Sequence, residues 1–111
     1  MNSIGFLFED KVEWQELGEG VRRQVLGYDE KLMTVKVEFQ SGSIGTLHSH
    51  VHSQTTYVAS GVFEFEINSV KQIVKSGDGL YIAPETVHGV VCLESGILID
   101  SFSPVRADFL K

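Results

Sequence analysis

Short segments in which apolar and polar residues alternate run through most of the chain, and turn residues separate them. The clearest segment covers 32–40, where apolar side chains alternate with Thr34, Lys36 and Glu38. Its apolar members are Met33, Val35, Val37 and Phe39. A period of two is typical of a β-strand with one buried face. No window holds a 3.6-residue period long enough to predict a helix, so the pattern predicts an all-β protein, either a sandwich or a small barrel.

We expect about ten short strands in this chain of 111 residues, which is long enough for one domain with a buried core. The clearest expected strands are 21–28, 32–40, 47–50, 55–59, 62–67, 71–75, 80–82, 89–93 and 97–103. Ser60-Gly61 and Glu94-Ser95-Gly96 are expected to be turns between neighbouring strands. Residues 1–17 are expected to form an arm packed on the body, residues 18–103 the barrel and residues 104–111 a tail.

Composition argues against several classes of function. The net charge of −6 disfavours nucleic acid, whose phosphates need a basic surface. It also disfavours anionic ligands, unless a metal ion or a local arginine makes the site positive. No apolar run approaches the ~18–20 residues of a membrane helix, and the acidic N-terminus lacks the basic start of a signal peptide. The single cysteine, Cys92, excludes an internal disulfide and suits a reducing cytoplasm; its apolar neighbours indicate a buried core residue.

Three of the four histidines, His48, His50 and His52, lie within five residues, and Gln54 follows two positions later. In an extended strand, His48 and His50 share one face with their Cα atoms roughly 6.6 Å apart, so both imidazoles can reach one metal ion. The remaining histidine, His88, lies far downstream and is the natural candidate to complete such a site. Alternating histidines also occur on solvated strand faces, so the pair alone leaves both interpretations open.

Two spaced motifs around these histidines resemble the cupin family. The first reads Gly42, His48, His50, Gln54 and Gly61, and the second reads Gly77-Asp78-Gly79, Pro84, Thr86 and His88. The chain departs from the family pattern where Gln54 replaces the usual Glu and Thr86 the usual Gly. The resemblance implies a cupin-type jelly-roll β-barrel in a single domain, with a metal ion inside. It assigns the ligand roles to His48, His50, Gln54 and His88.

Replacing the Glu ligand by Gln54 changes the chemistry that the resemblance implies. Three imidazoles and an amide leave the charge of a divalent ion uncompensated, which makes it a stronger Lewis acid toward substrate oxygens. The ligand set suits one divalent transition metal ion, Ni, Zn, Fe, Co or Mn, and does not choose among them. A degenerate or empty site with Gln54 as an ordinary polar strand residue is the alternative. His52 has no ligand role in the family pattern and is interpreted as a residue of the turn or its surroundings.

A second cluster closes the chain with Asp100, Phe102 and Arg106, and Pro104 precedes the arginine. Asp100 and Phe102 share one strand face. A lone Asp there is an edge residue in contact with solvent, or, in a barrel, an acid in the mouth with a pKa suited to proton transfer. Arg106 either clamps a substrate carboxylate bidentately or pairs at the surface with Asp108.

This C-terminal cluster, together with the histidine stretch, resembles a subgroup of small cupins that act on unsaturated uronates. The subgroup implies conversion of 4,5-unsaturated monouronates, released from pectin and alginate, into linear 4-deoxy-5-keto uronates. By the same resemblance, Asp100 is the catalytic acid/base, and Phe102 and Arg106 bind the substrate, a small anionic sugar acid. The expectation is therefore a metal-dependent ring-opening enzyme.

Two other classes stay open. One is a non-catalytic cupin that senses a small acid, and the other is a metal-dependent dioxygenase, which the missing Glu ligand disfavours. We expect a cytoplasmic protein that binds neither nucleic acid nor membrane. Jelly-roll cupins often pair through a sheet edge or an N-terminal arm, so the apolar arm predicts a homodimer. The arm residues concerned are Phe6, Phe8, Val12 and Trp14.

Overall fold

A computed structural model describes residues 1–111 and contains eight β-strands and one short 3-10 helix. The strands are β1 (Gln15–Gly18), β2 (Val21–Tyr28), β3 (Met33–Phe39), β4 (Ile44–His48), β5 (Ser53–Ile67), β6 (Val70–Lys75), β7 (Gly79–Ile82) and β8 (His88–Ser103). The 3-10 helix η1 covers Ala107–Leu110. The all-β prediction is therefore confirmed. None of the helical structure has the length and apolar character needed to cross a bilayer.

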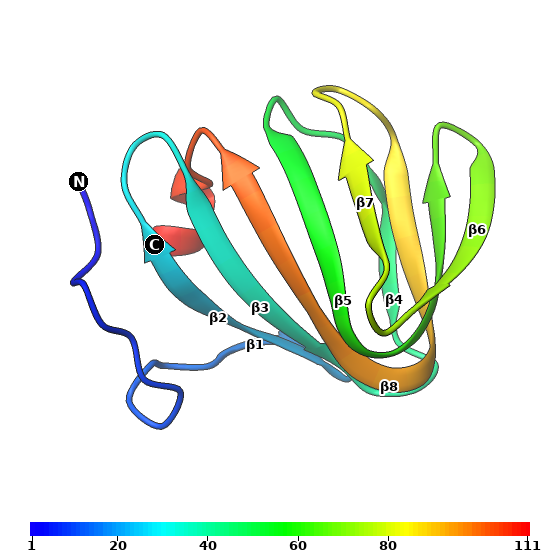
Figure 1. The fold of residues 1–111 in the computed structure, drawn as a ribbon, viewed down its shortest axis with the longest axis horizontal. Coiled ribbons are helices and arrows are strands. Elements are labelled where there is room, and N and C mark those ends of the chain that lie inside the picture. The colour runs from blue at the N-terminus through cyan, green and yellow to red at the C-terminus, as the bar shows by residue number, and fades with distance from the viewer.

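The strands form one antiparallel sheet in the order β1-β2-β3-β8-β5-β6, with β4 added to β8 and β7 added to β5. Strands β5 and β8 are the longest, with 15 and 16 residues, and pair along most of their length. Figure 1 shows both strands bending at the bottom of the molecule, so that each contributes to the two limbs of the barrel. The limbs diverge toward the upper end, where β5 and β8 begin.

The turns predicted at Ser60-Gly61 and at Glu94-Ser95-Gly96 are wrong, because β5 and β8 continue through them. The pairing between the strands shifts register around Ser60, which is the bend seen in Figure 1. A Cβ atom on Gly61, at φ +85°, would lie 2.6 Å from the Glu94 carbonyl oxygen, and one on Gly96 would lie 2.1 Å from the Ser60 carbonyl oxygen. The glycines therefore allow two backbones to meet at a sharp bend.

Three further boundaries differ from the expectation. The strand predicted over 47–50 is β4, which ends at His48 and leaves His50 in a loop. The first strand begins at Gln15, inside the segment expected as an arm, because residues 15–18 pair with 21–23 across a tight turn. The predicted tail contains the helix η1, whose four residues are too few to show a helical period in the sequence.

The N-terminal arm carries exposed aromatic rings. Phe6 and Phe8 are 79% and 59% exposed, and their rings stack with centroids 6.4 Å apart. Trp14 instead packs on the outside of the sheet, beneath the guanidinium group of Arg22, whose Cζ atom lies 3.8 Å from the ring centroid. The homodimer expected from this arm stays a prediction.

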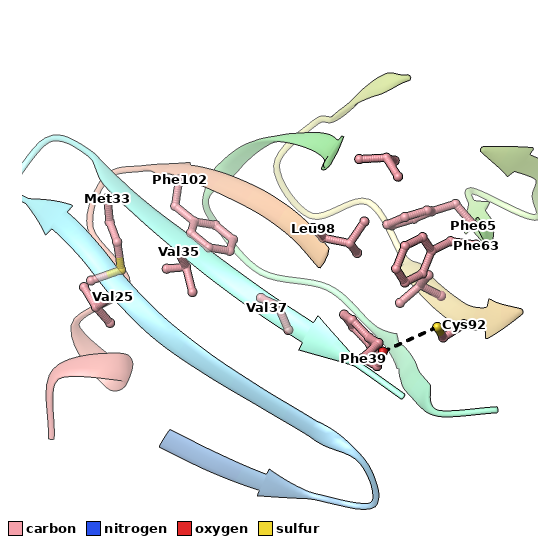
Figure 2. Packing of buried hydrophobic residues seen from close by; sticks show 12 residues of the cluster. Val25, Met33, Val35, Val37, Phe39, Phe63, Phe65, Cys92, Leu98 and Phe102 are labelled. Carbon is pink, nitrogen blue, oxygen red and sulfur yellow. Dashed lines mark hydrogen bonds between the residues drawn. The ribbon is translucent and has the colours of Figure 1, made fainter. Parts of the chain in front are cut away.

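The apolar core follows the alternation in the sequence. All four apolar residues of β3 are buried, and their side chains face Leu98 and Phe102 of β8 (Figure 2). Phe39 and Phe63 meet edge to face near the bend, with ring centroids 5.4 Å apart. Cys92 is buried beside them, as expected, and burial raises the pKa of its thiol. The core therefore extends along the barrel, from Met33 and Phe102 at one end of β3 to Phe39 and Phe63 near the bend.

Phe63→Ala should lower the free energy of unfolding by about 3–5 kcal/mol, because the ring is fully buried and its removal leaves a cavity. Urea denaturation followed by circular dichroism measures this change. Phe6→Ala is the matched control, since the exposed Phe6 ring should change stability by less than about 0.5 kcal/mol. Equal effects of the two substitutions would contradict the placement of the core.

Candidate metal and ligand site

Strand pairing brings two of the predicted histidines together. β4 ends and β8 begins at the open end of the barrel, where His48 is the direct partner of His88 in the antiparallel register. Opposite residues in such a pair project to the same face. Their ring centroids lie 4.4 Å apart, and His88 is buried whereas His48 remains exposed. The structure therefore places His88 beside the upstream His48.

His50 reaches the same point from the loop after β4. The Glu85 amide donates a hydrogen bond of 2.7 Å to the His50 carbonyl, which ties this loop to the loop before β8. The His50 ring centroid lies 4.9 Å from that of His88 and 5.7 Å from that of His48. His50 does not share a strand face with His48 as expected, because β4 ends at His48. The hydrogen bond between the two loops positions His50 instead.

The three imidazoles form a cluster that can hold one metal ion. Their candidate ligand atoms all lie within 4.8 Å of one another, near enough for the three residues to hold one ion together. Each Nδ1 atom contacts a backbone carbonyl, of Thr46, His52 and Thr86 respectively. These contacts select the tautomer in which Nδ1 carries the proton and Nε2 keeps its lone pair.

Burial keeps two of these rings neutral. The pKa of His50 and that of His88 are both lowered below the ordinary histidine value, chiefly because burial disfavours the charged imidazolium. A neutral imidazole is the form that binds a metal ion. His50 and His88 therefore present ligand lone pairs at neutral pH.

The direction of hydrogen bonding around Gln54 provides a test of whether a cation fits. The Thr56 hydroxyl donates to Asp100 Oδ1 over 2.7 Å, and Thr56 Oγ1 accepts from Gln54 Nε2 over 3.0 Å. Gln54 Oε1 therefore faces His50 Nε2, at 2.9 Å. Because His50 Nδ1–H already donates to the His52 carbonyl, two lone pairs face each other when the ring is neutral. A cation bound by both atoms removes this conflict, so the donor set fits a metal ion.

Asp100 lies on the inner face of β8 and completes this chain of hydrogen bonds. Its strand neighbours in the sheet are Val35 on one side and Thr56 on the other. Burial raises the pKa of Asp100 to about 6, against the opposing effects of the Thr56 hydroxyl and the Arg106 charge. A carboxyl group with this pKa exchanges its proton readily near neutral pH.

His48, Gln54, His88 and Asp100 line one cavity of about 230 Å³ at the open end of the barrel. His50 adjoins it through its contacts with His88 and Gln54. The cavity walls are half apolar and include the rings of Phe102 and Phe109. The charged and polar side chains that line it are Arg23, His48, Gln54, His88, Asp100 and Arg106. Two histidines of the three-histidine cluster, an acid with a raised pKa and two guanidinium groups therefore share one space, which is large enough for a small organic ligand.

Residues 35–99, more than half of the chain, match the protein family described as Cupin domain. The chain belongs to the cupin family. The architecture agrees, because an RmlC-like cupin from Shewanella frigidimarina superposes with a TM-score of 0.95 at 42% identity, covering 97% of each chain. The expected cupin-type jelly-roll β-barrel is thus confirmed.

Two relatives of this cupin carry the same name. The pectin degradation protein KdgF of Dickeya dadantii (strain 3937) is 47% identical over 107 residues, which cover 95% of this chain and 97% of that protein. The structure of KdgF from Halomonas sp. superposes with a TM-score of 0.91 at 36% identity and covers 96% and 99% of the two chains. The similarity to KdgF therefore extends over nearly the whole length of this cupin.

Arg106 of this cupin lines the cavity, but its guanidinium group is already engaged. Its Nε and Nη2 atoms donate to the two carboxylate oxygens of Asp108, over 3.1 and 3.0 Å. The guanidinium carbon lies 4.3 Å from the Phe109 ring centroid and 5.2 Å from that of Phe102. Both interpretations of Arg106 from the sequence therefore describe part of its position, since it pairs with Asp108 and also faces the cavity.

His52 is not part of the three-histidine cluster, although its ring centroid lies 5.3 Å from that of His50. Its Nε2 atom is 3.2 Å from the Val105 carbonyl oxygen, so the ring contacts the C-terminal tail. Its ring packs near Phe102, with centroids 6.3 Å apart. His52 therefore joins the histidine loop to the tail that carries Arg106.

The sequence reasoning missed two residues of the site. Thr56 hydrogen-bonds to both Gln54 and Asp100 and so orients them. The sequence could have indicated it, because Thr56 lies two positions after the ligand candidate Gln54 and so on the same face of the strand. Arg23 lines the cavity from β2. The sequence could have indicated it, because Arg23 is a charged residue between Val21 and Val25 on the apolar face of an alternating segment.

Proposed function

We propose that this cupin is a metal-dependent enzyme of pectin and alginate breakdown that opens 4,5-unsaturated monouronates into linear 4-deoxy-5-keto uronates. The similarity to the pectin degradation protein KdgF over 95% of the chain supports the substrate class. The observation that carries the proposal is that Asp100, with its raised pKa, lines a 230 Å³ cavity together with His48 and His88 of the three-histidine cluster. Proton transfer beside a metal ion is what this ring opening requires.

The reaction is an isomerisation and needs no other reactant. The substrate is a cyclic enol ether with a carboxylate at C5 and a hemiacetal hydroxyl at C1. When the hydroxyl loses its proton, the O–H electron pair forms the C1 carbonyl and the C1–O5 bond breaks onto O5. The resulting enolate at C5 becomes a ketone when C4 gains a proton. Every atom of the substrate is retained, and one proton moves from O1 to C4.

Asp100 is the group that would carry this proton. With a pKa of about 6, it is mostly ionised at neutral pH and accepts the O1 proton, which it can then return to C4. The Thr56 hydroxyl donates to Oδ1, so Oδ2 is the oxygen that would contact the substrate. The two proton transfers would thus use one carboxyl oxygen that the hydrogen bond leaves free.

The residues that would hold the metal ion are His48, His50, His88 and Gln54. A bound divalent ion, Ni, Zn, Fe, Co or Mn, would supply Lewis acid stabilisation of the negative charge that develops on sugar oxygens. Phe102, whose ring lines the cavity, would cover the sugar ring and exclude water. Arg106 would add positive charge at the same wall.

The test is to incubate the metal-loaded protein with 4,5-unsaturated galacturonate. We expect the enol-ether ultraviolet absorbance to disappear faster than in the spontaneous reaction and NMR to detect the linear keto acid. A metal-loaded protein that binds the compound without accelerating the reaction would contradict the proposal and identify a sensing cupin. Oxygen consumption during turnover, followed with an oxygen electrode, would instead identify a dioxygenase.

A further inference from the structure

Arg23 occupies a position where the strand pattern otherwise places apolar side chains. It lies on β2 in register with Val37 of β3, which is in register with Leu98 of β8. All three residues line the cavity that His48 and His88 also line. A charged side chain in this row loses part of its hydration, which is costly unless another group compensates for the loss.

The contacts of Arg23 leave most of its donors free. Its Nε–H donates to Gln15 Oε1 over 2.7 Å, and its guanidinium carbon lies 3.6 Å from the Phe109 ring centroid. No carboxylate lies within salt-bridge distance of this arginine, whereas both carboxylate oxygens of Asp108 are already bound to Arg106. The two terminal NH₂ groups of Arg23 therefore have no hydrogen-bond acceptor in the protein.

Arg23 lacks the carboxylate partner that Arg106 has at this wall of the cavity. Arg23 and Arg106 both pack on Phe109, but both carboxylate oxygens of Asp108 bind Arg106 and no carboxylate hydrogen-bonds to Arg23. Asp100, the other acid of the cavity, takes its hydrogen bond from Thr56. Burial and the neighbouring Arg106 charge lower the pKa of Arg23, while the Asp108 charge opposes them. A ligand carboxylate would supply the hydrogen-bonded anion that Arg23 lacks.

We propose that Arg23 is the residue that binds the carboxylate of the ligand and makes the cavity selective for acidic over neutral sugars. Its free terminal NH₂ groups suit a bidentate contact with a planar carboxylate. Arg106, held by Asp108, is then the neighbouring charge that reinforces this contact. The inference rests on the proposed function for the identity of the ligand as a sugar acid, and it transfers the main specificity role from Arg106 to Arg23.

A purely structural Arg23 would pack on Phe109 and bind Gln15 with no effect on ligand charge. Two ligands that differ only in this charge distinguish the roles: galacturonate, a saturated sugar acid, and galactose, its neutral counterpart. Arg23→Gln removes the charge and keeps the polar side chain. Arg22→Gln is the matched control on the same strand, because Arg22 pairs with Glu38 and does not line the cavity.

Isothermal titration calorimetry with the metal-loaded proteins measures the Kd of each sugar. For Arg23→Gln we expect galacturonate to bind about 10- to 100-fold more weakly, with galactose binding unchanged. Arg22→Gln should bind both sugars as the unsubstituted protein does. With 4,5-unsaturated galacturonate, Arg23→Gln should raise KM while kcat stays within about threefold, because Arg23 binds the ligand without moving protons.

Arg23→Lys keeps the charge and provides a second variant if Arg23→Gln fails to fold, as judged by circular dichroism. It should lie between the two proteins in galacturonate affinity, since a lysine loses the planar fork but not the cation. Galacturonate binding that is unchanged in the folded Arg23 variants, or no preference for galacturonate over galactose in the unsubstituted protein, would overturn the proposal. Charge-selective binding that Arg23→Gln abolishes, with no ring opening by the unsubstituted protein, would support Arg23 and contradict only the enzymatic function.

Discussion

Asp100→Asn should lower kcat for ring opening by about 10²- to 10⁴-fold and leave metal binding intact. The Asn side chain has nearly the same shape as Asp, and its amide oxygen can still accept the hydrogen bond from Thr56. It cannot accept and return a proton at neutral pH, so only the chemical step is lost. Steady-state kinetics with 4,5-unsaturated galacturonate, together with elemental analysis of bound metal, measures both quantities.

Ser101→Ala is the control for this substitution, because Ser101 is the next residue of β8 and its side chain is exposed on the opposite face. It should turn over substrate at the rate of the unsubstituted protein. If Asp100→Asn keeps more than about a tenth of kcat, Asp100 is not the group that moves the proton. If Asp100→Asn loses its metal, the residue acts through the ion site instead.

The double substitution His50→Ala, His88→Ala should abolish metal binding. It removes two of the three imidazoles whose ligand atoms lie within 4.8 Å of one another. Loss of a single supporting residue around a metal site costs about 10- to 100-fold in affinity, so loss of two ligands exceeds that range. Elemental analysis after dialysis against Ni²⁺ gives the stoichiometry. In the unsubstituted protein, Ni²⁺ at about 100 times its Kd should stabilise the fold by about 2.7 kcal/mol and raise Tm.

His52→Ala is the matched control, since it removes an imidazole from the same loop whose Nε2 contacts the Val105 carbonyl. This variant should bind one ion per chain and show the same Ni²⁺-dependent rise in Tm. Full metal occupancy in the His50 and His88 double variant would refute the ligand set. Loss of the ion from His52→Ala alone would show that the cluster extends to a fourth imidazole.

The alternation of residue types could be interpreted correctly because it is a local property. In β3, a period of two separates buried Met33 and Val35 from partly exposed Thr34 and Lys36, and the structure agrees. The same reasoning placed Asp100 and Phe102 on one face of β8. The motif spacing that resembles cupins added His88 to His48 and His50, which no local pattern connects.

Local patterns failed where distant backbones meet. Glycine is common in turns, so the sequence predicts turns at Gly61 and Gly96. In the structure they lie within β5 and β8, where the missing side chain lets the two backbones approach each other at the bend. His50 has the parity of a strand residue, yet it lies in a loop that the Glu85 amide holds in place. Neither contact is encoded within a window of a few residues.

The sequence by itself determined the all-β fold class of this cupin, the inward face of its clearest strands and the candidate metal-binding residues. Only the tertiary structure decided what shares the cavity with that cluster. The pairing of β2 with β3 and of β3 with β8 brings Arg23 to the wall, and the fold of the tail commits Arg106 to Asp108. Side-chain parity indicates which face a residue lies on, whereas the register between strands, set by long-range hydrogen bonds, decides which residues it meets there.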